Sequence, residues 1–352
     1  MKILFLPKYN IDGASSRYRT YQYLSIFNNL KYGVSSFFPY GYIVKMNSIW
    51  YKFFCFIYLI IRRSVVIVFQ SCKYDLIVIE KELIPYFPPI LEYILHLCHK
   101  KFVFDFDDAI YINYENHKLS FIRWLFGKKI QKIVSMASGI TTGSPELTSY
   151  LSHFNSKVIE IPTSIDLEKY KLSTPKYIQN YTIGWIGSRS TSKHIDTIAE
   201  VLLHFISLHK DVELRLIGYY GTVFQDKERV SIIPWNAKTE LHEILQFHVG
   251  LMPLTDSPFE HGKCGFKLIQ YMACAKPTIS TPFSANIKID SGKGNLFAST
   301  QKEWLVSLIN VYSNRIFYEN VGKRNRINVE ENYSIQGNKY KYIELFKSIT
   351  EI

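Results

Sequence analysis

Cysteine is scarce in this chain, and the cysteines that are present follow no recognisable spacing. There are five among 352 residues, an odd number, and no two form a CxxC pair. A secreted domain held together by disulfides and a zinc-finger protein are therefore not expected. We expect reduced, mostly buried thiols in a cytoplasmic protein.

Acidic residues are also scarce. The chain has 30 Asp and Glu against 42 Lys and Arg, a formal net charge of +12, which favours anionic partners. It has no dense basic run, no zinc-finger spacing and no RNP-type aromatic motif, so we expect no nucleic-acid partner. Aromatic residues make up 16% of the chain, and together with the basic excess they suit a membrane surface that carries lipid-phosphate substrates. The inner face of the cell membrane is therefore one partner to test, for a peripherally attached protein.

No apolar run in the sequence is both long and free of charge. Met1–Tyr9 is too short in its apolar part for a secretory signal, and we expect a first strand there. Trp50–Phe69 has the length of a membrane span, but Arg62 and Arg63 lie inside it, and each central arginine costs roughly 2.5–3.5 kcal/mol on insertion. Two interpretations stay open, a soluble helix that covers a sheet and an interfacial helix that docks on the inner membrane leaflet.

Short apolar segments alternate with helical patterns along the whole chain, which is typical of α/β proteins with parallel sheets. The predicted strands are Ile3–Leu6, Val34–Phe38, Leu76–Ile79, Phe102–Phe106, Gly139–Thr142, Val158–Ile161, Thr182–Ile186, Glu213–Ile217, Val230–Ile233, Gly250–Met252, Pro277–Ser280 and Leu296–Ala298. The predicted helices are Arg17–Asn29, Ser48–Val68, Leu83–His99, Leu119–Met136, Pro145–Phe154, Lys193–His209, Thr239–Phe247, Gly265–Cys274, Gln301–Tyr312, Asn314–Glu331 and Ile335–Ile349.

The polar segment Pro162–Pro175 interrupts this alternation and reads as an interdomain linker. We therefore predict two doubly wound parallel-sheet domains, at residues 1–165 and 166–330, followed by a helix at 331–352. Such sheets bind ligands beyond the carboxyl ends of their strands, so the expected site is the cleft between two facing domains.

Residues 259–281, FEHGKCGFKLIQYMACAKPTIST, hold the most informative pattern. A loop with two lysines and two glycines precedes an amphipathic helix and a buried strand. Gly265 lies near the expected helix start, where unpaired N–H groups and the positive end of the helix dipole bind phosphate. Lys263 and Lys267 would add full charges. The alternative is an ordinary α/β passage with solvated lysines, and Cys264 in this loop is expected to pack rather than to react.

Two further segments carry candidate polar groups. In WIGSRST, Gly187 permits a tight turn, and the hydroxyls of Ser188, Ser190 and Thr191 could bind phosphate or simply cap the next helix. Arg189 could pair with phosphate or be exposed.

The segment FDFDDAIY, at 104–111, allows three interpretations. Asp105 and Asp107 match the metal-binding Asp-x-Asp of the GT-A fold. They also match the Asp-x-Asp-x-Thr of haloacid-dehalogenase phosphatases, except that Ala109 replaces the Thr. The third interpretation is an acidic turn that lines a cleft, with a purely structural turn as the remaining possibility.

Five segments, in this order, resemble family 4 of the GT-B glycosyltransferases (group 1) over about residues 3–298. They are ASSRYRTYQYL, FDFDDAIY, IPTSIDLEKY, IGWIGSRSTSKHID and the segment 259–281. The resemblance implies an N-terminal acceptor-binding domain, a C-terminal donor-binding domain and a final helix that packs back on the first. It implies transfer of a sugar from a nucleoside-diphosphate sugar to a glycan or lipid-linked acceptor, with retention of the anomeric configuration. The resemblance implies neither a metal nor any other cofactor.

The resemblance also assigns roles to residues. The expected donor-binding residues are Gly187, Ser188, Arg189, Thr191, Glu260, Lys263, Gly265, Phe266, Lys267, Leu268 and Gln270. The candidate catalytic residues are Asp107, Asp108 and Arg17, and the loop near the diphosphate and acceptor contributes Gly13, Ser15 and Arg19. For Arg19 a solvated helix face is the alternative.

One departure from the family pattern affects the donor. Family 4 enzymes usually carry E-x7-E in the segment 259–281, whereas this chain has Gly262 and Gln270 at those positions, with Glu260 as a displaced candidate. Two other functions therefore stay open. A sugar-nucleotide epimerase of the same fold would convert the donor without an acceptor, and a non-catalytic GT-B protein would act as a scaffold in glycan assembly.

Overall fold

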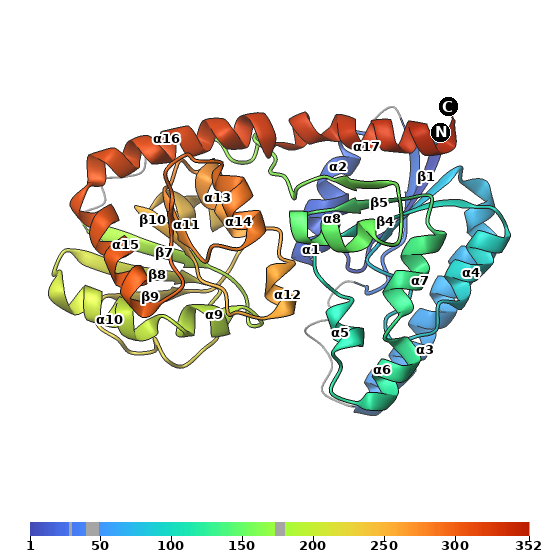
Figure 1. The fold of residues 1–352 in the computed structure, drawn as a ribbon, viewed down its shortest axis with the longest axis horizontal. Helices are drawn as coiled ribbons and strands as arrows, with labels where there is room; N and C mark the ends of the chain where they lie inside the picture. Colours follow the sequence, from blue (N-terminus) through green and yellow to red (C-terminus); the bar gives the residue numbers. More distant parts are fainter. Residues whose placement is uncertain (28–29, 40–48, 173–179, 352) are drawn as a thin grey trace. The chain divides into compact units, whose positions relative to one another are not determined.

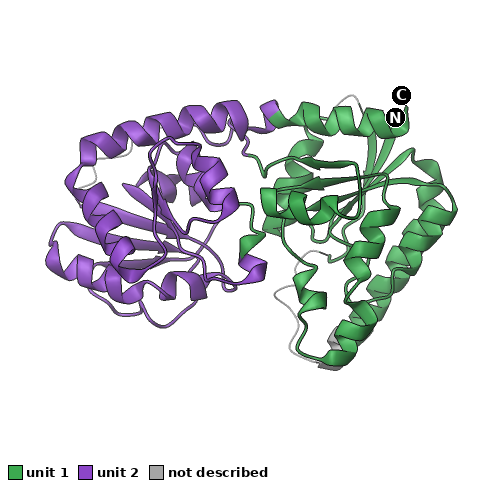
Figure 2. Ribbon diagram, viewed as in Figure 1, with its two compact units in different colours: residues 1–164, 261–264, 338–352 green, residues 165–260, 265–337 purple. Residues whose placement is uncertain are grey.

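A computed structural model describes residues 1–27, 30–39, 49–172 and 180–351. The chain divides into two compact units (Figure 2). Unit 1 comprises Met1–Ser164, His261–Cys264 and Asn338–Ile352, and unit 2 comprises Ile165–Glu260 and Gly265–Gly337. Residues 261–264, which the sequence places in the second domain, thus belong to unit 1, and so does most of the final helix.

Unit 1 contains a six-stranded parallel sheet in the order β2-β1-β3-β4-β5-β6 (Figure 1). Its strands are β1 Lys2–Leu6, β2 Lys31–Val34, β3 Leu76–Glu80, β4 Lys101–Phe106, β5 Gly139–Thr142 and β6 Val158–Glu160. Its helices are α1 Ala14–Ser16, α2 Gln22–Leu24, α3 Ile49–Val65, α4 Ile90–Leu97, α5 Ile112–Glu115, α6 Ser120–Phe126, α7 Lys129–Met136, α8 Pro145–Ser152 and most of α17 Ile335–Thr350, with π-helical turns at Arg17–Tyr21 and Val66–Gln70.

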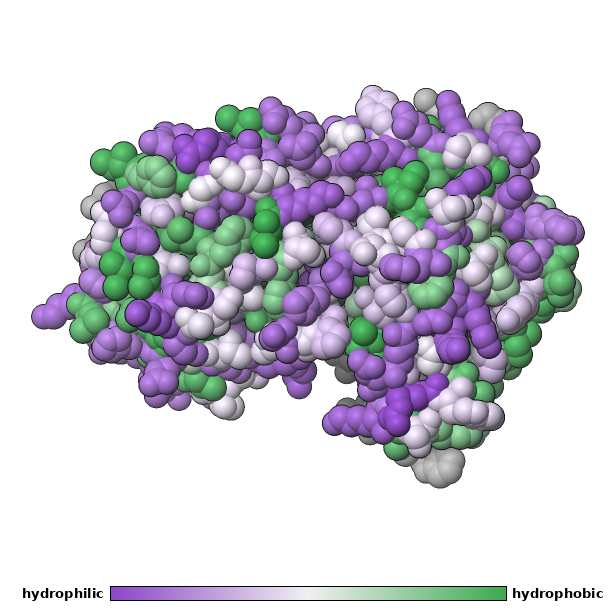
Figure 3. Space-filling view, in the orientation of Figure 1, coloured by the Kyte–Doolittle hydropathy of each residue, from purple (hydrophilic) through white to green (hydrophobic). Residues whose placement is uncertain are grey.

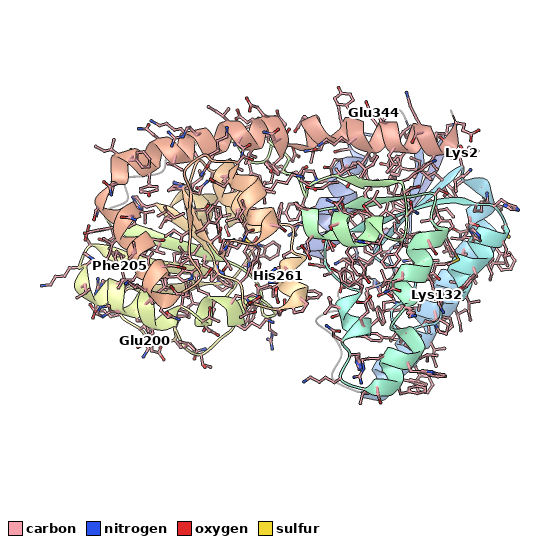
Figure 4. All side chains as sticks on the ribbon, viewed as in Figure 1. Lys2, Lys132, Glu200, Phe205, His261 and Glu344 are labelled. Atoms are coloured by element: carbon pink, nitrogen blue, oxygen red, sulfur yellow. The ribbon has the colours of Figure 1, made fainter. Side chains whose placement is uncertain are left out.

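Unit 2 contains a second six-stranded parallel sheet, in the order β12-β11-β10-β7-β8-β9. Its strands are β7 Tyr181–Ile186, β8 Val212–Ile217, β9 Val230–Ile233, β10 Val249–Met252, β11 Thr278–Ser280 and β12 Leu296–Phe297. Its helices are α9 Ser192–Asp196, α10 Ala199–Leu208, α11 Glu240–Leu245, α12 Pro258–His261, α13 Phe266–Ala273, α14 Ser284–Asp290, α15 Gln301–Ser313 and α16 Arg315–Asn332. Helix α10 illustrates the packing, since it buries Phe205 in the core and exposes Glu200 (Figure 4).

The predicted α/β class with two doubly wound parallel sheets is confirmed, and two of the deviations in single elements have local causes. The helix predicted over Leu83–His99 begins only at Ile90, because Pro85, Pro88 and Pro89 cannot supply interior N–H groups. The helix predicted over Leu119–Met136 breaks into α6 and α7 at Gly127. The second strand lies at 31–34 rather than at 34–38.

Aromatic side chains join α17 to the core of unit 1. Tyr342 lies edge-on to Tyr23 with ring centroids 4.9 Å apart, and Phe346 is 6.2 Å from Phe27. All five cysteines are free, but the expectation of mostly buried thiols is wrong, because only Cys264 and Cys274 are buried.

Candidate functional site

The strand order reverses once in each sheet. In unit 1 the reversal lies between β1 and β3, and in unit 2 it lies between β7 and β10. Doubly wound sheets bind ligands at such points, outside the carboxyl ends of the strands. The segments that the sequence marks as functional follow β1, β4, β7 and β10, so each unit gathers its candidate residues at one edge of its sheet.

In unit 1, a buried lysine holds the two candidate catalytic carboxylates. The Lys81 ammonium lies 2.9 Å from an Asp107 carboxylate oxygen and 2.7 Å from one of Asp108. Lys81 follows β3 directly and has a left-handed backbone with φ 64°, which costs a non-glycine residue about 1–2 kcal/mol. Lys81 was not among the predicted site residues, although it follows the buried strand β3 just as Asp107 follows β4.

Two serines complete this cluster. The Ser15 hydroxyl donates to the Asp107 carboxylate, and the Ser16 hydroxyl donates to Glu80 Oε2 over 2.6 Å. The Lys8 backbone N–H donates to the same oxygen over 3.2 Å. Glu80, at the end of β3, was not among the predicted site residues either. It brings a third carboxyl close to the point where the strand order of unit 1 reverses.

The electrostatic surroundings push the pKa values of Asp107 and Glu80 apart. Burial alone would raise the pKa of Asp107, but the Lys81 ammonium and the Ser15 hydroxyl outweigh burial and hold this pKa below its usual value. Burial, reinforced by the charge of Asp107, raises the pKa of Glu80 to about 7. Asp107 is therefore ionised at neutral pH and able to accept a hydrogen bond or a proton from a hydroxyl, while Glu80 titrates near neutrality.

The Arg19 side chain is buried inside unit 1 and does not lie on a solvated helix face. It is only 4% exposed. Its guanidinium Nε donates to Asp105 over 2.9 Å, and Nη1 donates to the Ile161 carbonyl over 2.7 Å. Its ion-pairing capacity is thus already used by Asp105. Arg17, by contrast, lies over the Tyr18 ring, 5.0 Å from its centre.

Gly13 and the loop residues of unit 1 have clear packing roles. A Cβ atom at Gly13 would lie 2.3 Å from Cβ of Tyr9, so only glycine fits where the chain enters α1. Lys263 approaches Asp108 at 3.9 Å. The Cys264 thiol donates to the Asp107 carbonyl over 2.8 Å, and burial raises its pKa well above the usual value, so Cys264 packs in the loop as expected.

In unit 2, the turn after β7 is closed by its own hydroxyls. The Ser188 N–H donates to Thr191 Oγ1 over 2.9 Å, and the Ser192 hydroxyl donates to the Ser188 carbonyl over 3.0 Å. Thr191 occupies the N-cap position of α9 without a side-chain cap bond. A Cβ at Gly187 would lie 2.1 Å from the Trp185 ring, so the tight turn requires glycine. Arg189 stacks over Tyr220, 5.0 Å from the ring centre.

The N-terminus of α13 reaches the same edge of the sheet. Gly265 is its N-cap with φ 64°, and a Cβ there would lie 2.3 Å from Ile289 Cδ1. The Lys267 ammonium lies 4.8 Å from the centre of the Trp185 ring, the indole that also packs beneath Gly187. The turn after β7 and the N-terminus of α13 therefore meet, as the phosphate-site hypothesis requires. Leu268 is buried in the core of unit 2, and Phe266 packs against that core.

Gln270 belongs to a buried network that the sequence did not predict. Its amide nitrogen donates to Glu240 Oε1 and to the Tyr170 hydroxyl, both over 2.9 Å. Tyr170 also donates to Glu240 Oε1 over 2.7 Å, and the Trp235 indole N–H donates to Glu240 Oε2 over 2.5 Å. A carboxylate from α11 thus stands beside the position where the family pattern expects a glutamate.

Glu260 lies apart from that network. It is 3% exposed, and its Oε1 lies 3.3 Å from the Lys193 ammonium and 3.4 Å from His194 Nε2. It therefore ties α12 to α9.

The Asp-x-Asp pair does not converge on a common point. Asp105 binds Arg19 and Thr141, whereas Asp107 binds Ser15 and Lys81. Among the described residues, no group of three or more His, Cys, Asp or Glu is placed to hold a metal ion. Each carboxylate instead has its own cation.

Similarity to known proteins is found in the fold and not in the sequence. No family model and no curated protein sequence matches the chain. Sucrose-phosphate synthase from Thermosynechococcus elongatus is similar with a TM-score of 0.73 at 11% identity, covering 100% of this chain and 99% of that one. HepE from Anabaena, solved with UDP, gives a TM-score of 0.68 at 14% identity, covering 99% of this chain and 100% of that one.

A third similar structure is a protein assigned as a UDP-N-acetylglucosamine 2-epimerase from Listeria monocytogenes. Its TM-score is 0.62 at 10% identity, covering 99% of this chain and 96% of that one. Together these structures show that the chain has the fold of the GT-B glycosyltransferases, whereas the haloacid-dehalogenase and GT-A interpretations of FDFDDAIY require other folds.

Proposed function

We propose that this protein is a glycosyltransferase that moves a sugar from a nucleoside-diphosphate sugar to a hydroxyl of a glycan or glycolipid. The observation that carries the proposal is the meeting of two motifs in unit 2. Gly187 and Lys267 contact the same indole, Trp185, at the point where the strand order reverses. A tight hydroxyl-rich turn, a helix N-terminus and an ammonium group there form a site for a diphosphate.

The chemistry that we propose is electrostatic and needs no metal. The ammonium of Lys267 and the first N–H groups of α13 would stabilise the diphosphate as it leaves. In unit 1 the ionised Asp107 and its neighbour Asp108 are the groups available to bind or activate an acceptor hydroxyl. HepE, which has this fold, was solved with UDP and with UDP-glucose, and this favours a uridine donor. Retention of anomeric configuration, a role in surface polysaccharide synthesis and a cytoplasmic location belong to the same proposal.

Thermal stabilisation by UDP, GDP, CDP and ADP tests the donor site, with and without Mg²⁺. A nucleotide at 100 times its Kd stabilises the folded protein by about 2.7 kcal/mol. We expect a metal-independent shift with one nucleotide, lost in Lys267→Ala and kept in Lys302→Ala, which removes an exposed lysine of α15. Absence of a shift with every nucleotide would contradict the proposal and favour a scaffold role.

A sugar-nucleotide epimerase is the second candidate, because the Listeria protein shares the fold. Incubation with the donor alone separates the two. An epimerase converts the sugar nucleotide without an acceptor, whereas a transferase consumes donor rapidly only when an acceptor hydroxyl is supplied.

A further inference from the structure

Helix α3 of unit 1 turns its hydrophobic side outward. Every exposed residue between positions 53 and 69, along α3 and the π-helical turn after it, is hydrophobic. These residues, which we call the α3 face, are Phe53, Phe54, Ile57, Tyr58, Ile61, Val65, Val68 and Phe69. Their spacing of three or four places them on one side of the helix. Phe54 is 65% exposed and Phe69 is 67% exposed.

The two arginines of this segment point into unit 1 and hold the helix in that orientation. Arg63 is 3% exposed and donates to the Pro7 carbonyl over 3.3 Å. Arg62 donates to the carbonyls of Ser36 and Phe37. A surface helix of a soluble protein normally exposes its charges and buries its apolar side. The α3 face inverts this pattern, so it is not an ordinary solvated helix surface.

Other exposed hydrophobic residues of unit 1 occur on α4 and around α6. Trp124 is 79% exposed and Phe121 64%, both on α6, while Leu97 of α4 is 74% exposed. Figure 1 draws α6 toward the same end of unit 1 as α3, and Figure 3 shows hydrophobic side chains along the edge where α3 and α4 are drawn. Large exposed apolar areas mark interaction sites in soluble proteins.

The positive charge of the chain is concentrated in the same unit. The residues of unit 1 include 23 Lys and Arg against 13 Asp and Glu, whereas those of unit 2 include 19 against 17, so unit 1 carries +10 of the total +12. No acidic residue occurs between Asp12 and Asp75, the stretch that contains α3. Lys73 at the end of this stretch and Lys132 on α7 (Figure 4) are exposed.

We propose that unit 1 docks on an anionic phospholipid bilayer through the α3 face. An apolar and aromatic helix face on a unit that carries a strong excess of basic residues is a combination that binds the interface of anionic membranes. A second copy of the chain is a poorer occupant, because it would bring two strongly positive units together. The docking does not depend on the proposed activity. Only its interpretation, as access to a lipid-linked acceptor, rests on the proposed function.

The helix docks in the interface and does not span the bilayer. Phe53–Lys73 is long and apolar enough to cross a membrane by length and composition. However, Leu59 and Ile67 are buried within unit 1, as is Arg63. Spanning would pull these side chains out of the unit and move Arg63 from its carbonyl partner into hydrocarbon.

Flotation of the full-length protein with vesicles tests the proposal. We compare phosphatidylcholine vesicles with vesicles that also contain phosphatidylglycerol, for the wild type and for Phe54→Ser/Phe69→Ser. The matched control is Ile316→Ser/Phe317→Ser on α16 of unit 2, where both residues are exposed. We expect binding to the anionic vesicles that weakens with salt, falls at least about tenfold in the α3 variant and is unchanged in the control.

Two results would overturn the proposal. One is vesicle binding that is absent, or equal in the α3 variant and the wild type. The other is a solution dimer that dissociates in the α3 variant while no vesicle binding is seen, which would make the α3 face a self-association surface. Cooperative thermal unfolding of the same variants, measured with and without nucleotide, shows in either case that they are folded. It also separates a failure of docking from a failure of the proposed transferase.

Discussion

Replacing Glu80 with glutamine should make the protein more stable at pH 8 but not at pH 5. Burial and the nearby Asp107 raise the pKa of Glu80 from 4.5 to about 7. Between these two values the folded protein holds a proton that the unfolded chain has lost, so stability falls as pH rises through this window and levels off above it. The glutamine side chain cannot ionise, and its amide oxygen can still accept from the Ser16 hydroxyl and the Lys8 N–H.

The size of the effect follows from the two pKa values. A difference of roughly two and a half units corresponds to about 3 kcal/mol. For a unit of this size, 1 kcal/mol changes the melting temperature by about 2–4 °C. Glu80→Gln should therefore melt about 6–12 °C above the wild type at pH 8 and close to it at pH 5. Scanning calorimetry of both proteins across this pH range measures the difference.

Glu82→Gln provides a matched control with the opposite sign. The Glu82 carboxylate accepts from the Lys129 ammonium and from the Tyr114 hydroxyl, each over 2.6 Å, and all three are buried. Removing its charge leaves a buried lysine unpaired, which costs about 3–5 kcal/mol. If Glu80→Gln and the wild type differ equally at pH 5 and pH 8, the argument from the buried carboxyl is refuted.

Two further substitutions test the site residues. Asp107→Asn should lower turnover about 100-fold or more while nucleotide-induced stabilisation is kept, because the ionised carboxylate is lost but unit 2 is untouched; unchanged turnover would exclude a catalytic role. Gly265→Ala should destabilise unit 2 by about 1–3 kcal/mol and weaken nucleotide binding, because its φ is 64° and the new Cβ would meet Ile289 at 2.3 Å. Gly292 has a similar backbone conformation, with φ 73°, but a Cβ added there would have no atom within 4 Å. An equal loss of stability in Gly292→Ala and Gly265→Ala would therefore show that the clash with Ile289 contributes nothing.

The two sheets could be predicted because strands that are buried on both faces appear in the sequence as short apolar runs. The order of the candidate motifs along the chain follows from the order of these strands. LIVIE at 76–80 and FVFDF at 102–106 are examples. The residues that follow such runs then lie at the carboxyl edge of the sheet. Glu80 and Lys81 obey the same rule, because they lie at the end of β3 and directly after it.

The partners of charged side chains could not be predicted in this way. Arg17 and Arg19 are two residues apart and look alike in the sequence, yet Arg19 is buried against Asp105, 86 positions away. Likewise, Gln270 is read from the sequence as the loss of a carboxylate, while the fold places Glu240 beside it. Pairing across such distances depends on which strands become neighbours, and local spacing carries no information about that.

The sequence by itself determined the class of the fold, the positions of most of its strands and the basic excess, because hydrophobic periodicity and composition are properties of neighbouring residues. Only the tertiary structure decided which charged side chains pair with each other and which surfaces face water. Trp50–Phe69 illustrates the difference. Its two arginines argue against a membrane when they are counted along the chain, but the fold turns both inward and leaves an apolar face outside. The direction of a side chain is set by packing against distant segments, and that packing exists only in the folded unit.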